Sequence, residues 1–221
     1  MIERYKTIYS GGEAETIEKK SRFIANVRLA ESEEEALGFI EEMKKKYWDA
    51  RHNCFAYTIG ERQEIVRAGD DGEPGGTAGR PMLDVLLGEG LCNIALVVTR
   101  YFGGTLLGTG GLVRAYSAAA REGIKASTII EKQYGTLLEI QTDYNGIGKI
   151  QYILGKYKIP ITDSQYTDVA AITILAPISQ IQSLKAEITE ATNGRAVMSE
   201  KENRYFAILK GRILTGDALR P

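Results

Sequence analysis

Apolar and polar residues alternate along several short segments of the first 130 positions, as they do in half-buried β-strands. The predicted strands are Ala14–Lys19, Arg22–Leu29, Asn53–Ile59, Glu64–Ala68 and Asn93–Tyr101. The last of these is an almost continuous run of apolar and β-branched residues, which is typical of a well-buried strand. The charged bend Lys19-Lys20-Ser21 separates the first two strands.

Helical spacing of apolar residues predicts three helices in the same region. The first follows Ser32, whose hydroxyl can cap it, and Glu35 three residues later completes a capping box. Its apolar face consists of Ala36, Phe39, Ile40, Met43 and Tyr47. The other two helices are predicted at Met82–Leu87 and from Leu112 to about Lys125, each directly after a glycine-rich loop.

The pattern changes after about residue 127. The sequence predicts a strand, a helix, a hairpin, a second helix and a final strand region, at Gly135–Asp143, Gly146–Tyr157, Ile159–Tyr166 with Asp168–Leu175, Ser179–Thr192 and Ala196–Leu209. The order βαββαβ is that of a ferredoxin-like sandwich. We therefore expect an α+β protein with an N-terminal α/β domain over residues 1–130 and a ferredoxin-like domain over residues 131–221.

Composition narrows the functional classes. The 221 residues include 28 Lys and Arg against 29 Asp and Glu, so any contact with nucleic acid must come from a local basic patch. No stretch is apolar enough to predict a membrane span, and the N-terminus does not resemble a signal peptide. Two isolated cysteines and one histidine predict buried thiols in a reducing cytoplasm, with no zinc site and no cofactor. The oligomeric state stays open.

Half of the 24 glycines lie between Gly69 and Gly111, and most of these are in two loops. The first loop contributes the candidate ligand residues Asp70, Asp71, Gly72, Glu73, Gly75, Gly76, Thr77 and Gly79. Its glycines permit close backbone approach, its amides lead into a helix N-terminus that suits a phosphate, and its acids suit a divalent ion. The alternative is an ordinary solvent-exposed turn. We favour a ligand loop, because a long Gly/Asp loop within a compact domain usually has a function.

The second loop contributes the candidates Arg100, Tyr101, Phe102, Gly103, Gly104, Gly108 and Arg114. It is not a phosphate-binding Walker loop, because no Lys-Ser/Thr pair follows the glycines. Nor does it form a spaced dinucleotide fingerprint within repeated βαβ units. The remaining interpretations are an amide-rich concavity for a phosphate, peptide or RNA backbone, and tight helix–strand packing that requires small residues.

Positive side chains near these loops form a possible track for RNA, with Lys20, Arg22, Arg121 and Lys125 as further basic contacts. Arg114, Ala118, Arg121 and Lys125 share one helix face, but a solvated surface is the simpler interpretation. His52 and Cys54 lie two residues apart on a predicted strand. They point the same way rather than converging, so we interpret them as a structural histidine beside a buried thiol and predict no catalytic residue.

The run Gly90-Leu91-Cys92-Asn93-Ile94-Ala95-Leu96-Val97-Val98-Thr99-Arg100-Tyr101-Phe102-Gly103-Gly104-Thr105-Leu106-Leu107-Gly108 closely resembles the signature of the IMPACT family and its YigZ-type members. The acidic loop, the Lys20-Ser21-Arg22-Phe23 turn and the His52-Asn53-Cys54 strand resemble it as well. The resemblance covers about residues 15–125. It implies an N-terminal fold similar to the second domain of a small-subunit ribosomal protein, and a C-terminal domain similar to the ferredoxin-like domains of elongation factor G.

Eukaryotic relatives in this family compete for the scaffold that activates a translation-initiation-factor kinase, and the family carries no agreed catalytic residues. The resemblance therefore implies a cytoplasmic binding protein linked to the regulation of translation. Its expected partners are RNA, the ribosome or a translation factor, contacted through the paired glycine loops and not at a membrane. The alternative is an enzyme that acts on a phosphorylated small molecule or nucleotide, with a metal held by the acidic loop.

Overall fold

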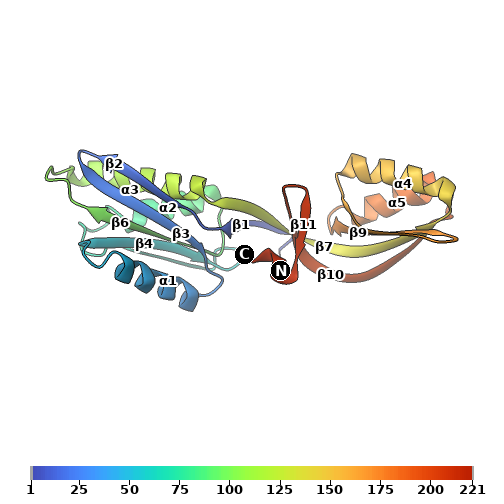
Figure 1. The fold of residues 1–221 in the computed structure, drawn as a ribbon, viewed down its shortest axis with the longest axis horizontal. Helices are drawn as coiled ribbons and strands as arrows, with labels where there is room; N and C mark the ends of the chain where they lie inside the picture. Colours follow the sequence, from blue (N-terminus) through green and yellow to red (C-terminus); the bar gives the residue numbers. More distant parts are fainter. Residues whose placement is uncertain (1, 221) are drawn as a thin grey trace. The chain divides into compact units, whose positions relative to one another are not determined.

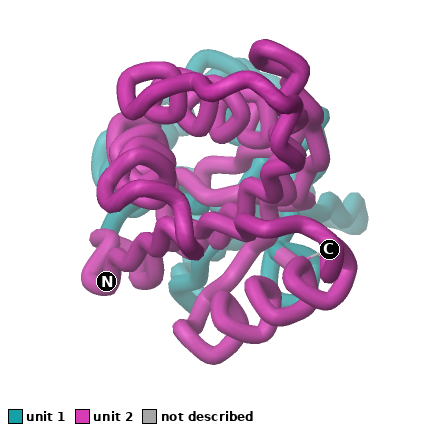
Figure 2. The backbone as a smooth tube through the Cα atoms, turned by 90° about the vertical axis from the view of Figure 1, so that its left-hand side faces the viewer, with its two compact units in different colours: residues 1–4, 132–219 teal, residues 5–131, 220–221 magenta. Residues whose placement is uncertain are grey.

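The computed structural model describes residues 2–220, which divide into two compact units. The N-terminal unit comprises Tyr5–Glu131 with the C-terminal residues after Leu219, and the C-terminal unit comprises Lys132–Leu219 with the N-terminal residues up to Arg4 (Figure 2). Among the described residues, no helix has the length and apolar character that crossing a bilayer requires.

The N-terminal unit contains an antiparallel sheet with the strand order β2-β3-β6-β4-β5. These strands are β2 (Glu13–Glu18), β3 (Ser21–Leu29), β4 (His52–Ile59), β5 (Ile65–Gly69) and β6 (Ile94–Tyr101). β6 lies at the centre and is buried along almost its whole length, as its β-branched sequence predicts. Because β3 and β4 flank β6, residues from three distant parts of the sequence meet where β6 ends.

Helices cover both faces of this sheet (Figure 1). On one face lies α1 (Glu33–Lys46), which packs Phe39, Ile40 and Met43 against Tyr57 and Val97 of the strands. The other face carries α2 (Gly79–Glu89) and α3 (Gly108–Ala126), whose apolar residues join the larger core around β3, β4 and β6. Each of these two helices begins at the end of a glycine loop, so the loops lie on the α2/α3 side of the sheet.

The C-terminal unit has the strand order β11-β10-β7-β9-β8, with antiparallel neighbours. Its elements are β7 (Thr128–Thr142), α4 (Tyr144–Tyr157), β8 (Ile161–Tyr166), β9 (Ala170–Pro177), α5 (Ile181–Ala191), β10 (Val197–Leu209), β11 (Arg212–Thr215) and a short 3₁₀ helix (Gly216–Leu219). The apolar faces of α4 and α5 pack on one side of the sheet (Figure 1). The first six elements form βαββαβ, so the predicted ferredoxin-like arrangement and the α+β class are confirmed.

Several elements differ from the sequence prediction. Two strands were not predicted, β1 (Arg4–Ser10) and β11. β1 pairs with β7 and is also bridged from Lys6 to Leu91, and both partners are far away in the sequence, so no local pattern predicts this strand. α3 begins at Gly108, four residues before the predicted start at Leu112, because Leu107 packs against the core and holds the first turn in place. Similarly, α2 begins at Gly79, since Pro81 is compatible with a first helical turn.

Of the two hydrogen bonds of the capping box predicted at the start of α1, one is formed as predicted and the other involves a different residue. The Ser32 hydroxyl oxygen accepts the Glu35 N–H at 3.1 Å. The Glu35 carboxylate, however, accepts the N–H of Glu31 at 2.7 Å rather than that of Ser32, so the reciprocal bond of a capping box is shifted by one residue. Both bonds satisfy amides that the helix itself leaves unpaired.

Replacing Ser32 by alanine tests this cap. The variant leaves one N–H of the first turn without its acceptor, and we expect the free energy of unfolding of the N-terminal unit to fall by about 1 kcal/mol. Urea denaturation followed by circular dichroism measures the change. Ser199→Ala, on an exposed strand position of the C-terminal unit, is the control. An equal effect of both substitutions would contradict a specific role for the cap.

Candidate functional site

Strand register brings the predicted site residues together at the end of β6. Arg100 lies opposite Phe23 of β3 on one side and opposite His52 of β4 on the other. Side chains alternate between the faces of a strand, so these three project on the same side of the sheet as α2 and α3. The first glycine loop joins β5 to α2, and the second joins β6 to α3. Both loops therefore border Arg100.

A buried ion pair connects the two loops. The Arg100 guanidinium donates from Nη1 to Glu73 Oε1 at 2.7 Å, and the two side chains are 7% and 3% exposed. Nη2 donates to Ser21 Oγ at 3.4 Å, and the rings of Phe23 and Phe102 lie 5.5 and 5.6 Å from the guanidinium carbon. Arg100 Nε is buried without a hydrogen-bond partner among the described residues. The aromatic faces offset part of this cost, since each attracts the cation.

Tyr116 of α3 completes this buried network. Its hydroxyl donates to Glu73 Oε1 at 2.8 Å and accepts the Cys54 thiol at 3.4 Å. Burial raises the pKa of Cys54 to about 12 and raises the pKa of Tyr116 far above its usual value. Both groups therefore keep their protons at neutral pH, which suits hydrogen bonding and not nucleophilic attack. The network is built to hold the loops in position.

The first loop turns its amides inward onto its own aspartate. The Asp70 carboxylate accepts the N–H groups of Gly76, Ala78 and Gly79 at 2.8, 3.0 and 2.7 Å. Partial burial acts to raise the pKa of Asp70, but these three donors outweigh it and hold the pKa below its usual value. Gly79 also has to be glycine, because a Cβ there would lie 2.7 Å from the Gly69 backbone nitrogen. The amides predicted to bind a phosphate thus bind a carboxylate of the chain itself.

The other members of the first loop are tied to β4 or turn outward. The Asp71 carboxylate accepts the Asn53 N–H at 2.7 Å, and the Asp71 carbonyl lies 2.9 Å from His52 Nδ1. The Asp70 carbonyl oxygen lies 2.9 Å from the Cys54 sulfur, so it shares the single thiol proton with the Tyr116 hydroxyl. The loop turns through positive φ at Asp71, Gly72 and Gly76; Gly75 is exposed, and the Thr77 hydroxyl donates to Pro74. The described residues contain no cluster of three or more His, Cys, Asp or Glu side chains that could hold a metal ion.

The second loop is open where the first is closed. Gly103 packs directly on the β2–β3 turn, since a Cβ there would lie 2.0 Å from the Lys20 carbonyl carbon, and its N–H donates to Ser21 Oγ at 3.1 Å. Beyond it, Gly104 and Gly108 have positive φ and face open space. The N-cap position of α3 is Leu107, which offers no capping side chain, and the first turn contains no acidic residue. Its amides keep the positive end of the helix dipole available.

The basic candidates are exposed, but they do not gather at one place: Arg121 and Lys125 lie toward the C-terminal end of α3, away from the second loop. Arg114 lies in the second turn of α3 and, with Lys19, lines a hollow of about 290 Å³ between β2 and α3. Arg22 forms a bidentate pair with Glu15 at 3.0 and 2.8 Å, and Lys125 pairs with Glu122 at 3.6 Å. Lys20 and Arg121 are exposed. Within the described part of the chain, neither Lys20, Arg114 nor Arg121 forms an ion pair.

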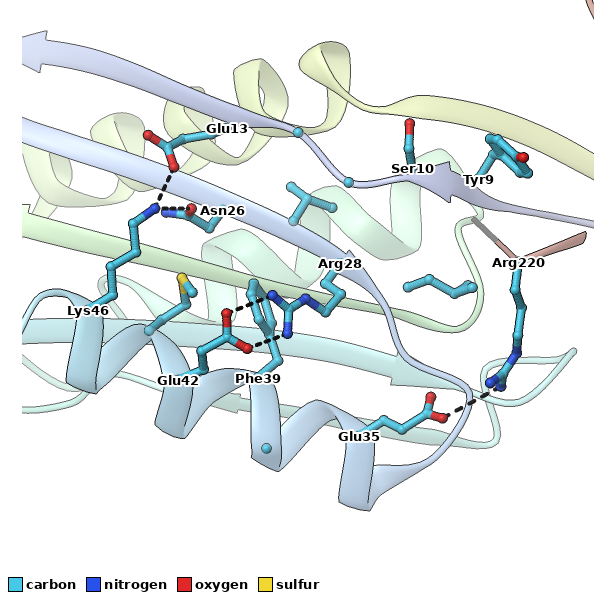
Figure 3. A pocket seen from close by; sticks show the side chains of 16 residues that line it. Tyr9, Ser10, Glu13, Asn26, Arg28, Glu35, Phe39, Glu42, Lys46 and Arg220 are labelled. Carbon is cyan, nitrogen blue, oxygen red and sulfur yellow. Dashed lines mark hydrogen bonds and ion pairs between the residues drawn. The ribbon is translucent and has the colours of Figure 1, made fainter.

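A larger hollow of about 1020 Å³ lies on the opposite face of the sheet, beside α1 (Figure 3). Its charged groups are paired with one another. Arg28 binds Glu42 with both terminal nitrogens, at 2.5 and 2.8 Å, and lies over the Phe39 ring at 4.5 Å. Lys46 pairs with Glu13 at 2.7 Å, and Arg220 pairs with Glu31 and with Glu35. A charged ligand in this hollow would have to displace these pairs.

Several residues of the network were not predicted as site residues. Ser21, Phe23 and Asn53 stand within segments that resemble the IMPACT family, but nothing local indicates that they support Arg100. Tyr116 lies on the buried face of α3. Its position one turn after Leu112 marks it as a core residue, and only the fold shows that its hydroxyl reaches Glu73.

Substitution of Arg100 tests the buried Arg100–Glu73 ion pair. Arg100→Met leaves Glu73 buried without its cation, so we expect the free energy of unfolding to fall by about 3–5 kcal/mol. The double variant Arg100→Met/Glu73→Leu removes both charges and should recover most of this loss, because apolar groups of similar size tolerate the same burial. Urea denaturation of both variants and the wild type measures the coupling. Equal losses in the single and the double variant would show that charge pairing is not what stabilises the loops.

Asp70→Asn tests the closed loop. Removing the charge that three amides bind should lower the free energy of unfolding by about 1 kcal/mol at neutral pH. A carboxyl whose pKa is lowered on folding stabilises fully above its unfolded pKa of about 3.9, and this contribution is lost as the pH falls through the folded value. The gap between variant and wild type should therefore close below about pH 4. Urea titrations at several pH values measure it, with the exposed Asp168→Asn as control.

Each of the two units matches a known protein family. The Impact N-terminal domain matches residues 19–124, and the Domain of unknown function DUF1949 matches residues 140–195. IMPACT family member YvyE of Bacillus subtilis is 38% identical over 93% of this chain and 95% of its own length. IMPACT family member YigZ of Escherichia coli is 36% identical over 80% of this chain and 87% of its own.

A further relative matches a shorter part of the chain, and a solved structure matches most of it. The Protein IMPACT homolog of Dictyostelium discoideum is 40% identical over 46% of this chain, which is 30% of that protein. A solved crystal structure of an hypothetical protein is 32% identical, covers 91% of this chain and 99% of its own, and superposes with a TM-score of 0.58. The sequence resemblance and the structural similarity agree over both units, and the chain therefore belongs to the IMPACT family.

Proposed function

We propose that this protein is a binding module linked to the regulation of translation, which contacts RNA, the ribosome or a translation factor in the cytoplasm. The contact surface is the second glycine loop with the first turn of α3 and Arg114. Membership of the family supports the link to translation, and the geometry of the second loop supports the choice of surface.

The difference between the two loops carries this proposal. In the first loop, Asp70 takes up the amides at the start of α2. In the second, the first turn of α3 has no capping side chain, and Leu106 is 83% exposed beside it. Leu106, the amides at the start of α3 and the unpaired Arg114 together offer a partner an apolar contact, an anion-binding helix terminus and a positive charge. The buried Arg100–Glu73 pair holds this loop in place, which lowers the ordering cost of binding.

The alternative is an enzyme that acts on a phosphorylated small molecule through an acidic metal loop. It has less support from the geometry, because Asp70, Asp71 and Glu73 each accept hydrogen bonds from within the unit. A metal would have to compete with those donors. Thermal-shift measurements with a nucleotide panel, with and without Mg²⁺, separate this alternative from the binding proposal.

Arg114→Ala tests the surface. We expect the wild type to co-sediment with ribosomes, and the variant to bind roughly fivefold more weakly with a salt slope reduced by about one, as loss of one phosphate contact implies. Pelleting assays at about 50 to 200 mM salt measure both quantities. Arg62→Ala removes an exposed charge from the β4–β5 turn, at the other end of the sheet, and serves as the matched control. Equal binding by both variants would rule out the α3 surface as the contact.

A further inference from the structure

Exposed aromatic and basic side chains gather where β6 ends. Trp48 follows α1 and is 82% exposed, and Phe102 follows β6 and is 53% exposed. Tyr101 connects them, because its hydroxyl donates to the carboxylate of Asp49, next to Trp48, at 2.7 Å. We call the surface formed by Lys19, Lys20, Arg22, Trp48, Tyr101 and Phe102 the strand-end surface.

The β2–β3 turn adds two lysines to this surface in an unfavourable conformation. Lys19 and Lys20 have φ angles of 45° and 68°, and the flanking residues Glu18 and Ser21 are paired across the hairpin. A two-residue hairpin turn with both φ angles positive favours Asn-Gly, because side chains with a Cβ are strained there. Both lysines are exposed, so packing does not explain their presence. Strain of this kind points to a functional requirement for the two ammonium groups.

The second glycine loop fixes these lysines beside the aromatic residues. Gly103 contacts the Lys20 carbonyl so closely that no side chain fits at that position. Phe102 precedes Gly103, so its backbone lies beside the lysine turn, and its ring faces the Arg100 guanidinium. The Ser21 hydroxyl oxygen accepts both the Gly103 N–H and a guanidinium N–H of Arg100. The buried Arg100–Glu73 pair therefore supports the strand-end surface directly.

Arg22 contributes a flat surface as well as a charge. Its guanidinium lies 5.6 Å from the centre of the Tyr101 ring, which it faces across the β3–β6 pair. Stacked aromatic rings and guanidinium planes are the platforms on which unpaired bases stack. Glu15 neutralises Arg22, and Asp49 is engaged with Tyr101. The further charges in the segments that meet here are Lys19, Lys20, Arg51 and Arg114 against Glu18 and Asp49, which leaves an excess of positive charge.

We infer that the strand-end surface binds single-stranded RNA. The bases stack on Trp48, Tyr101 and Phe102, while Lys19 and Lys20 contact the phosphates. This inference rests on the proposed function for the choice of RNA, and it goes further in naming a single-stranded segment and the side chains that receive it. Stacking is sequence-tolerant, so the surface binds RNA with little base preference.

The key experiment exchanges the strained turn for its favoured sequence. Lys19→Asn/Lys20→Gly should raise the melting temperature by about 3 °C, because the strain is removed. The same variant should bind a 12-nucleotide oligo(U) RNA about tenfold more weakly, because two phosphate contacts are lost. Lys210→Asn is the matched control: it relieves a positive φ of 49° in the β10–β11 turn and removes one lysine there. It should leave RNA affinity unchanged.

Two further measurements address the aromatic residues. Trp48 is the only tryptophan in the chain, so stacking of a base should quench its fluorescence during titration with oligo(U). Phe102→Ala should weaken binding about tenfold, as loss of one stacked base implies, in an anisotropy assay with labelled RNA. Phe102 also faces the Arg100 guanidinium, so the melting temperature of Phe102→Ala should fall, and binding is measured well below it. An unchanged RNA affinity of the folded variant would overturn the role of Phe102 as a platform.

Other outcomes would overturn the inference outright. The first is that the wild type does not bind oligo(U) at 100 μM RNA, roughly a hundred times a micromolar dissociation constant. The second is that the Lys19→Asn/Lys20→Gly variant binds oligo(U) as tightly as the wild type. The third is that the protein binds the matching single-stranded DNA more tightly than the RNA. The proposed function fails separately. Ribosome pelleting that depends on Arg114 without any oligonucleotide binding overturns the RNA inference alone, and oligonucleotide binding without ribosome pelleting overturns the ribosome contact alone.

Discussion

Arg100 and Glu73 meet in a buried ion pair between the two glycine loops, and the local structure on both sides depends on it. Burying two charges costs more than their attraction returns unless further hydrogen bonds satisfy them. Tyr116 and Ser21 supply such bonds, and Phe23 and Phe102 supply aromatic faces. Four segments far apart in the sequence are therefore fixed to one another: the β2–β3 turn, the acidic loop, the end of β6 and α3.

This constraint gives the two loops different roles. The acidic loop is held by Glu73 on one side and by the contacts of Asp70 and Asp71 on the other, so its polar groups are directed into the protein. The second loop is held at Gly103 and at Leu107, and its glycines Gly104 and Gly108 face open space. A rigid scaffold that presents an unsatisfied loop is the usual arrangement of a binding site. The hollow beside α1 lacks this character, because its charges are already paired (Figure 3).

Local sequence was sufficient for most of the fold. Ser32 predicted the start of α1, the β-branched run predicted β6, and the βαββαβ order predicted the C-terminal sandwich. The prediction was incomplete where stabilisation is non-local. β1 needs its pairing with β7 and its bridge to Leu91, and the early start of α3 needs the packing of Leu107. The Glu35 carboxylate bound an amide one residue away from the expected one, because the path of the chain before a helix is set by its tertiary contacts.

The sequence by itself determined the family, the secondary-structure order and the concentration of glycine and charge in two loops, since all of these are local or compositional. It did not distinguish the two loops, because the local sequence does not show whether a backbone amide stays free or is bound by a side chain such as Asp70. Nor did it place Tyr116 beside Glu73 or Trp48 near Tyr101, because strand register and helix packing bring those residues together. Only the tertiary structure decided which glycine loop is closed upon itself and which is left open, since that depends on the partners each polar group finds after folding.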